Sequence, residues 1–280
     1  MSYVALITGA SSGIGEALAR LLSSQLPDSR VVLVARREER IQALAAELNR
    51  SAPEPRAHAY RADLTDPQAP TSIAAYLQQN FGHLNLLVNN AGARWSAPFA
   101  SAGYANVAQT MAINFDAQVQ LTEAVLGLLR NAVAQNGATP ESATARAAIV
   151  NVASTAARVS RPGTAAYSAS KAALLAWGDG LHHELAPEGI HVGVVNPGFI
   201  ATEGFPAKEL RAHPLKRLLV STPEKAAAAV LEAGPGGKAE VFVPGYYELA
   251  AIARSLAPGL LRRAVGGGSF NTTTSADAEH

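Results

Sequence analysis

The stretch YVALITGASSGIG at residues 3–15 decides the fold. Its apolar, β-branched start, Tyr3–Thr8, predicts a buried strand, and the Ala/Leu-rich run Gly15–Gln25 predicts a helix directly after it. Between them, one glycine permits a tight turn, a second lets the backbone approach a pyrophosphate, and a third allows close packing of the helix on the strand. The start of the helix adds free N–H groups and partial positive charge. This loop therefore predicts a phosphate-binding turn, with a glycine-rich turn that binds nothing as the alternative.

Short β-branched runs alternate with longer Ala/Leu-rich runs along the rest of the chain. This alternation predicts a Rossmann-like α/β fold: a doubly wound parallel sheet of about seven strands, with right-handed crossovers and helices on both faces. The predicted strands are Tyr3–Thr8, Arg30–Ala35, Ala57–Ala62, Leu84–Val88, Ala148–Val152, His191–Val195 and Glu240–Val243. The predicted helices are Gly15–Gln25, Glu38–Arg50, Thr71–Asn80, Tyr104–Val133, Thr164–Leu185 and Pro223–Glu232.

No repeat or break in composition divides the body of the chain, so we expect a single domain over residues 1–265. The Gly/Ser/Thr/Asn-rich end, residues 266–280, predicts a disordered tail, and residues 136–146 predict a polar loop. The apolar segment Tyr246–Val265 contains three arginines. It could pack on its own domain or on a partner subunit, cover a substrate cleft, or touch a membrane surface.

Composition excludes several classes of protein. The 280 residues are 48% apolar and 16% charged, which is sufficient for a large core, and the net charge of +1 gives no bulk attraction to nucleic acid or to an anionic membrane. The absence of cysteine excludes disulfides and thiolate metal sites, and the seven histidines show no metal-ligand spacing, so we expect no metal. No apolar window is long enough for a membrane span, and the start of the chain has no basic leader. The predicted compartment is the cytoplasm.

Further motifs follow the glycine loop, whose spacing is TGxxxGxG at residues 8–15. With these motifs in order from Tyr3 to Val243, the chain resembles the short-chain dehydrogenase/reductase family in its compact single-domain form. The motifs are NNAG at residues 89–92, Asn114, Ser154, YSASK at residues 167–171, and Pro197-Gly198 followed by Thr202.

The residue types in these motifs suit hydride transfer to or from a carbon that bears oxygen. Tyr167 and Lys171 are four residues apart on one helix, so an ammonium can lie near a phenol and favour its ionised form. The Ser154 hydroxyl, at a strand end, can hydrogen-bond a carbonyl oxygen. The resemblance implies that Tyr167 donates the proton, Ser154 positions the carbonyl, Lys171 holds the nicotinamide ribose and Asn114 supports a water-linked proton relay. A surface Tyr–Lys pair is the alternative.

Residues at the end of the second predicted strand indicate the cofactor. An NAD-selective site usually has Asp or Glu about 20 residues after the glycine loop, but this chain has Ala35 there, followed by Arg36 and Arg37. Guanidinium groups suit the 2′-phosphate of NADP, and Arg36 is the favoured contact because it is nearer to the strand end. The alternative is that both arginines are solvated.

The remaining expected cofactor contacts, by resemblance, are Gly9, Ser11, Ser12, Gly13, Ile14, Gly15, Asp63, Leu64, Asn90, Ala91, Gly92, Tyr167, Lys171, Pro197, Gly198, Ile200 and Thr202. For Asp63 the alternative is a turn or helix-cap role.

Loops beyond the strand ends are expected to form the substrate pocket. The candidate substrate contacts are Arg94, Trp95, Phe199 and Phe205. Arg94 and Arg158 could anchor an anionic group of the substrate, or both could be solvated. The aromatic residues could form an apolar pocket or could serve only in packing. The leading interpretation is an NADP-dependent carbonyl reductase or alcohol dehydrogenase that acts on a small molecule, and the family implies a homodimer or homotetramer. The alternatives are an NADP-binding sensor or scaffold without catalysis, and a reductase of enoyl or imine bonds.

Overall fold

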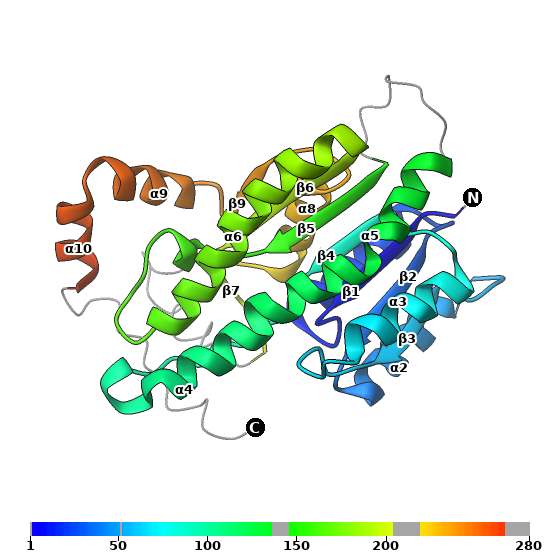
Figure 1. The fold of residues 1–280 in the computed structure, drawn as a ribbon, viewed down its shortest axis with the longest axis horizontal. Helices are drawn as coiled ribbons and strands as arrows, with labels where there is room; N and C mark the ends of the chain where they lie inside the picture. The colour runs from blue at the N-terminus through cyan, green and yellow to red at the C-terminus, as the bar shows by residue number, and fades with distance from the viewer. Residues whose placement is uncertain (1, 51, 136–145, 204–218, 267–280) are drawn as a thin grey trace.

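A computed structural model describes residues 2–50, 52–135, 146–203 and 219–266. Its main sheet has seven parallel strands in the order β3-β2-β1-β4-β5-β6-β9 (Figure 1), which confirms the predicted fold class. The strand order reverses between β1 and β4, where open sheets of this kind bind ligands. The strands are β1 Val4–Thr8, β2 Arg30–Ala35, β3 Ala57–Arg61, β4 Leu86–Asn89, β5 Ala147–Val152, β6 Ile190–Pro197 and β9 Glu240–Val243.

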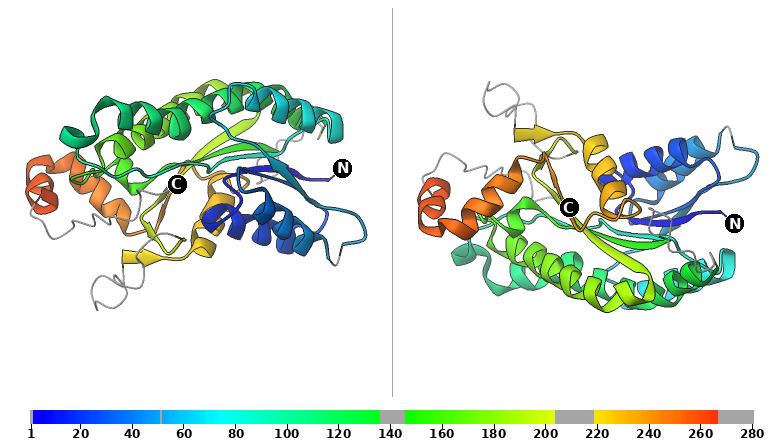
Figure 2. Two further views of the ribbon diagram at one scale, coloured as in Figure 1. Left: turned by 90° about the horizontal axis from the view of Figure 1, so that it is seen from below. Right: turned by 90° about the horizontal axis from the view of Figure 1, so that it is seen from above.

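Helices cover both faces of this sheet (Figure 2). One face carries α1 Gly13–Gln25, α2 Glu38–Asn49 and α8 Pro223–Ala233; the other carries α3 Ala69–Asn80, α5 Ala117–Gln135 and α6 Ala165–Leu185. Successive strand residues supply the two cores: Ile7 packs with the first group of helices and Leu6 with the second. This burial on both faces explains why the strands have nearly continuous apolar sequences.

The predicted helix Tyr104–Val133 is wrong as a single element. The structure has α4 Phe99–Met111, a π-helical turn η1 at Ala112–Asp116, and then α5. Gly103, with φ of +58°, also breaks the regular backbone of α4. The apolar periodicity continues through these irregularities, so it could not reveal them. Wider turns of this kind are frequent at functional sites.

The C-terminal segment forms two helices, α9 Tyr247–Leu256 and α10 Pro258–Gly266, beyond the carboxyl end of the sheet (Figure 1). A small second sheet, β7 Phe199–Ile200 with β8 Val220–Ser221, was not predicted. Two short turns, η2 Thr155–Ala157 and η3 Ala186–Glu188, flank α6. No helix within the described ranges is long and apolar enough to cross a membrane. The predicted tail and most of the polar loop at residues 136–146 lie outside the described residues.

Candidate active site

A cavity of about 1740 Å³ lies at the carboxyl edge of the sheet, where the strand order reverses. Sites for single small ligands usually measure roughly 300–1,000 Å³, so this volume has room for a dinucleotide and a second molecule. Residues from both ends of the sequence line the cavity, from the glycine loop to α10. Of the predicted contacts it brings together Gly9, Ser11, Ser12, Gly13, Ile14, Arg36, Arg37, Asp63, Leu64, Asn90, Ala91, Gly92, Arg94, Trp95, Ser154, Tyr167, Lys171, Pro197, Gly198, Phe199, Ile200 and Thr202.

The glycine loop forms a cradle that side chains would fill. Gly9 and Gly13 have φ of +66° and +61°, and a Cβ on Gly13 would come within 2.9 Å of the Thr202 side chain. Gly15 does not line the cavity: a Cβ there would lie 2.6 Å from the Gly9 carbonyl oxygen, so this glycine serves close packing. The bare backbone before α1 fits the pyrophosphate of a dinucleotide.

Two arginines lie beside this cradle with different partners. Arg37 donates to Ser11 Oγ at 3.0 Å and pairs with Glu203 at 3.1 Å, while Arg40 also binds Glu203. Both arginines hold the pKa of the Glu203 carboxyl at about 2. Arg36 is largely exposed and reaches Asp63 only at 3.9 Å. The cationic groups expected near a 2′-phosphate are therefore present, and Arg37 is the one anchored to the glycine loop.

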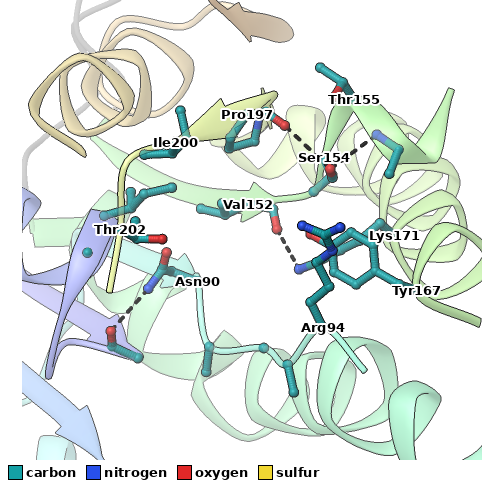
Figure 3. A pocket seen from close by; sticks show the side chains of 18 of the residues that line it. Asn90, Arg94, Val152, Ser154, Thr155, Tyr167, Lys171, Pro197, Ile200 and Thr202 are labelled. Atoms are coloured by element: carbon teal, nitrogen blue, oxygen red, sulfur yellow. Dashed lines mark hydrogen bonds between the residues drawn. The ribbon is translucent and has the colours of Figure 1, made fainter. Parts of the chain in front are cut away.

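Asp63 and Asn90 hold the loops on either side of the cradle. Asp63 Oδ1 accepts from the Thr65 backbone N–H at 3.0 Å and from the Thr65 hydroxyl at 2.7 Å. Asp63 therefore stabilises the turn after β3, which was the alternative to a cofactor contact, and it also lines the cavity. Asn90 Nδ2 donates to the Thr8 carbonyl oxygen at 2.7 Å and to the Gly9 carbonyl oxygen at 3.3 Å (Figure 3). These bonds join the end of β4 to the end of β1 and the glycine loop.

Ser154 and Tyr167 meet in the wall of the cavity opposite the cradle (Figure 3). Ser154 is buried two residues after the end of β5. Its Oγ accepts from the Ala156 N–H at 3.1 Å and donates to the Pro197 carbonyl oxygen at 3.4 Å. Burial raises the pKa of the Tyr167 hydroxyl, and interaction with Ser154 opposes that rise. Arg94 and Arg161 also lower the pKa of Tyr167. Sequence analysis assigned neither of these two arginines to the phenol.

Lys171 lies one turn after Tyr167, as the spacing predicted, and is only 4% exposed. Its Nζ donates to the Val152 carbonyl oxygen at 2.8 Å (Figure 3), and burial lowers its pKa to about 8. An ammonium has three donors, so Lys171 retains donors for hydroxyl groups of a ligand in the cavity.

Asn114 is fully buried in η1 and does not line the cavity. Its Nδ2 donates to the Ala93 carbonyl oxygen at 2.9 Å and to Ser170 Oγ at 3.0 Å, and its Oδ1 accepts from the Ala93 N–H at 2.8 Å. These bonds join the NNAG loop to α6. In this geometry the Asn114 side chain positions the loop, and its part in a water-linked proton relay stays a prediction.

The substrate end of the cavity differs in part from expectation. Arg94, Trp95 and Phe199 line the cavity as expected. Arg158 pairs with Glu240 at 3.1 Å and so is not free to anchor an anion. Phe205 lies outside the described residues. Sequence reasoning missed Arg161, whose guanidinium lies 4.7 Å over the Phe199 ring.

Sequence reasoning also missed Tyr247 of α9. A Cβ on Gly198 would come within 2.5 Å of the Tyr247 ring, so the C-terminal segment packs directly on the loop after β6. Two of the alternatives for this segment therefore occur together: it packs on its own domain, and it covers the cleft, since Tyr247, Ala250 and Leu261 line the cavity. Within the described part of the chain, no group of three His, Asp or Glu side chains could hold a metal ion.

The sequence matches the family model of short chain dehydrogenases over residues 3–212, three quarters of the chain. The chain belongs to the short-chain dehydrogenase family. As a member of this family it is an oxidoreductase that binds a nicotinamide cofactor. The cradle, the free donors of Lys171 and the large cavity fit such a cofactor.

Two named relatives and one solved structure are similar to this short-chain dehydrogenase over most of its length. It is 31% identical to dehydrogenase/reductase SDR family member 7B of Xenopus laevis, covering 92% of this chain and 79% of that one. It is 30% identical to the ketoacyl reductase HetN of a Nostoc strain, over 85% and 77% of the two chains. A crystal structure of a short-chain dehydrogenase from Streptomyces avermitilis superposes with a TM-score of 0.73 at 27% identity, over 96% of this chain and 98% of that one.

Proposed function

We propose that this short-chain dehydrogenase is an NADP-dependent carbonyl reductase or alcohol dehydrogenase. One observation carries the proposal: Ser154, Tyr167 and Lys171 line one wall of the cavity whose other end is the glycine cradle. A protein that only sensed or displayed a dinucleotide would not require this group of side chains. The nicotinamide, when bound, supplies or accepts the hydride.

The chain's own residues handle the carbonyl oxygen and its proton. Ser154 donates a hydrogen bond to that oxygen, which stabilises the negative charge that develops there during reduction. Tyr167 gives its hydroxyl proton to the same oxygen as general acid, and takes it back in the reverse direction. Lys171 stabilises the resulting phenolate electrostatically and binds ribose hydroxyls with its free donors. Ser154 and Lys171 are almost fully shielded from water, which strengthens their electrostatic interactions.

The preference for NADP rests on Arg36 and Arg37. Both line the cavity next to the glycine cradle, and no carboxylate occupies position 35 to repel a 2′-phosphate. The sequence favours Arg36 as the contact to the 2′-phosphate. Because Ser11 anchors Arg37 beside the glycine loop, Arg37 is an equal candidate. The 2′-phosphate would compete with Glu203 for Arg37.

A screen of NADPH consumption tests the proposal. Aldehydes, cyclic ketones, β-keto esters, an enone and a cyclic imine are offered with NADPH or NADH at matched low concentration, and the products are identified. We expect alcohols from carbonyl groups, with NADPH preferred. Exclusive reduction of the C=C or C=N bond would favour the enoyl or imine alternative. Tight NADPH binding without any product would favour the sensor alternative.

A further inference from the structure

Two arginines lie close to the proposed catalytic tyrosine without a carboxylate partner in the described residues. Arg94 follows the NNAG motif and Arg161 precedes α6, and both line the cavity. Each guanidinium acts on the Tyr167 hydroxyl. Burial lowers the pKa of Arg161, and repulsion by the charge of Arg94 lowers it further. In Figure 3 the Arg94 side chain extends toward Tyr167 and Lys171. The two positive charges therefore converge on the space beside the reacting hydroxyl.

The other arginines of the cavity are paired with carboxylates. Among the described residues that line the cavity, the only carboxylates are Asp63 and Glu203, and both lie at the cradle end. Asp63 interacts with Thr65 and Arg36. Glu203 pairs with Arg37 and Arg40. Arg158 has Glu240. The end of the cavity that holds Tyr167 thus has an excess of positive charge.

Arg161 is held in place although one of its nitrogens has no partner. Its backbone N–H and carbonyl oxygen both bond the Thr164 hydroxyl, at 3.1 and 2.8 Å, and its guanidinium rests on the Phe199 ring. Yet its Nη1 is buried without a hydrogen-bond partner in the described structure. Arg94 binds Ser96 Oγ through Nε at 3.2 Å, which leaves its terminal nitrogens available. Buried donors on a charged group are costly unless an anion satisfies them.

We propose that Arg94 and Arg161 form an anion clamp, and that the substrate is a carbonyl compound carrying its own anionic group, a carboxylate or a phosphate. This inference rests on the proposed function and deepens it by naming the substrate class. Arginine is suited to both anions, because its planar donors bind their oxygens in pairs. Trp95 and Phe199, which also line the cavity, would flank the carbon skeleton.

Paired substrates test the clamp. Oxo acids with one to four carbons between the ketone and the carboxylate, and ketones bearing a phosphonate at the same spacing, are compared with their neutral methyl esters. We expect kcat/KM to favour the best anion over its ester by about tenfold to hundredfold, as for one or two charge-assisted hydrogen bonds. The better of the two anion series identifies which group the clamp takes.

Three variants locate the effect. Arg161→Gln and Arg94→Gln should each reduce the anion-to-ester ratio about tenfold or more. Arg158→Gln is the matched control, since that arginine lines the same cavity but is paired with Glu240, and it should keep the wild-type ratio. A ratio near one in the wild type, or equal ratios in all four proteins, would overturn the clamp. Reduction of the neutral esters in that case would leave the proposed function intact.

A binding measurement separates failure of the clamp from failure of the reaction. Pentanoate and propylphosphonate cannot be reduced, and their binding to the NADP⁺-loaded protein is followed by calorimetry, with pentanamide as the neutral control. The clamp predicts that one of the anions binds more tightly than pentanamide and loses about tenfold or more in Arg161→Gln or Arg94→Gln but not in Arg158→Gln. Such binding without carbonyl reduction would refute the proposed function and still support the clamp. Equal binding of anions and amide would refute the clamp.

Discussion

Lys171 carries a charge that the fold shields almost completely from water. Burial lowers its pKa from 10.5 to about 8, which corresponds to roughly 3 kcal/mol of unfolding free energy. Below pH 8 the folded protein bears this whole cost. Between pH 8 and 10.5 only the unfolded chain holds the proton, so the free energy of unfolding rises with pH; above 10.5 the cost is gone.

This dependence predicts the behaviour of Lys171→Met. The variant should exceed the wild type in unfolding free energy most strongly below pH 8, and the difference should shrink by roughly 3 kcal/mol toward pH 10.5. Urea unfolding of both proteins at several pH values measures the difference in their unfolding free energies. Both proteins contain the same tyrosines, so the effect of tyrosine titration cancels in this difference. A difference that stays constant from pH 7 to 10 would contradict the buried position of the amino group.

Arg36 and Arg37 permit a prediction on cofactor choice. Replacing either by Ala should reduce the preference for NADPH over NADH about tenfold or more, and Ala35→Asp combined with Arg36→Ala should favour NADH. Ratios of kcat/KM for the two cofactors measure this, with Arg130→Ala as control, since Arg130 pairs with Glu188 outside the cavity. Equal use of NADH and NADPH by the wild type would refute the assignment.

The spacing of residues in the sequence was sufficient to predict some members of the candidate site, but not others. The four-residue interval between Tyr167 and Lys171 places them on one helix face whatever surrounds them. Arg161 gave no such signal, because its role depends on the cavity wall contributed by Phe199. Likewise Arg158 was an open candidate because its partner Glu240 is 82 residues away in the sequence.

At the scale of elements, Asn114 joins the NNAG loop to α6 from within η1. The Asn114 side chain is fully buried and makes three bonds, two to Ala93 and one to Ser170, so Asn114→Ala would leave polar groups unsatisfied. We expect a loss of about 1–3 kcal/mol in unfolding free energy, together with a lower kcat/KM. Asn131→Ala is the control: Asn131 makes one exposed bond to the Gly82 carbonyl oxygen, and its loss should change stability by no more than about 0.5 kcal/mol.

If Asn114→Ala retained wild-type stability and turnover, the positioning role would be refuted. The sequence could not predict this role from the pattern of the helix. The Ala-rich run continues from α4 to α5, and only the three-dimensional contacts of η1 show that Asn114 faces the NNAG loop. The resemblance selected the residue for a proton relay, which stays a prediction, and the bonds of its side chain add a positioning role.

For the whole molecule, the alternation of strands and helices was sufficient to predict the parallel sheet, because each apolar strand requires a helix on both faces. The C-terminal cover was not predictable in the same way. The segment 247–266 is amphipathic, and its sequence does not say which surface its apolar face meets. In the structure that face lines the cavity, while Leu249, Leu256 and Leu260 on the outside remain exposed.

Two truncations test this division of the molecule. Ending the chain after Gly266 should leave the melting temperature and turnover unchanged, as the predicted tail requires. Ending it after Gly245 removes the cavity wall that Tyr247, Ala250 and Leu261 provide but keeps all seven strands of the main sheet. We expect a folded protein with KM for the carbonyl substrate raised about tenfold or more. An unchanged KM would refute the covering role of α9 and α10.

The central claim is that Tyr167 protonates a carbonyl oxygen during NADPH-dependent reduction. The most direct measurement is alcohol formation by Tyr167→Phe, with NADPH affinity determined on the same protein, because the ring is kept and only the acid is lost. We predict that turnover falls by about 10²–10⁴-fold while NADPH binding stays within about twofold of wild type. Turnover within threefold of wild type on a good carbonyl substrate would contradict the claim.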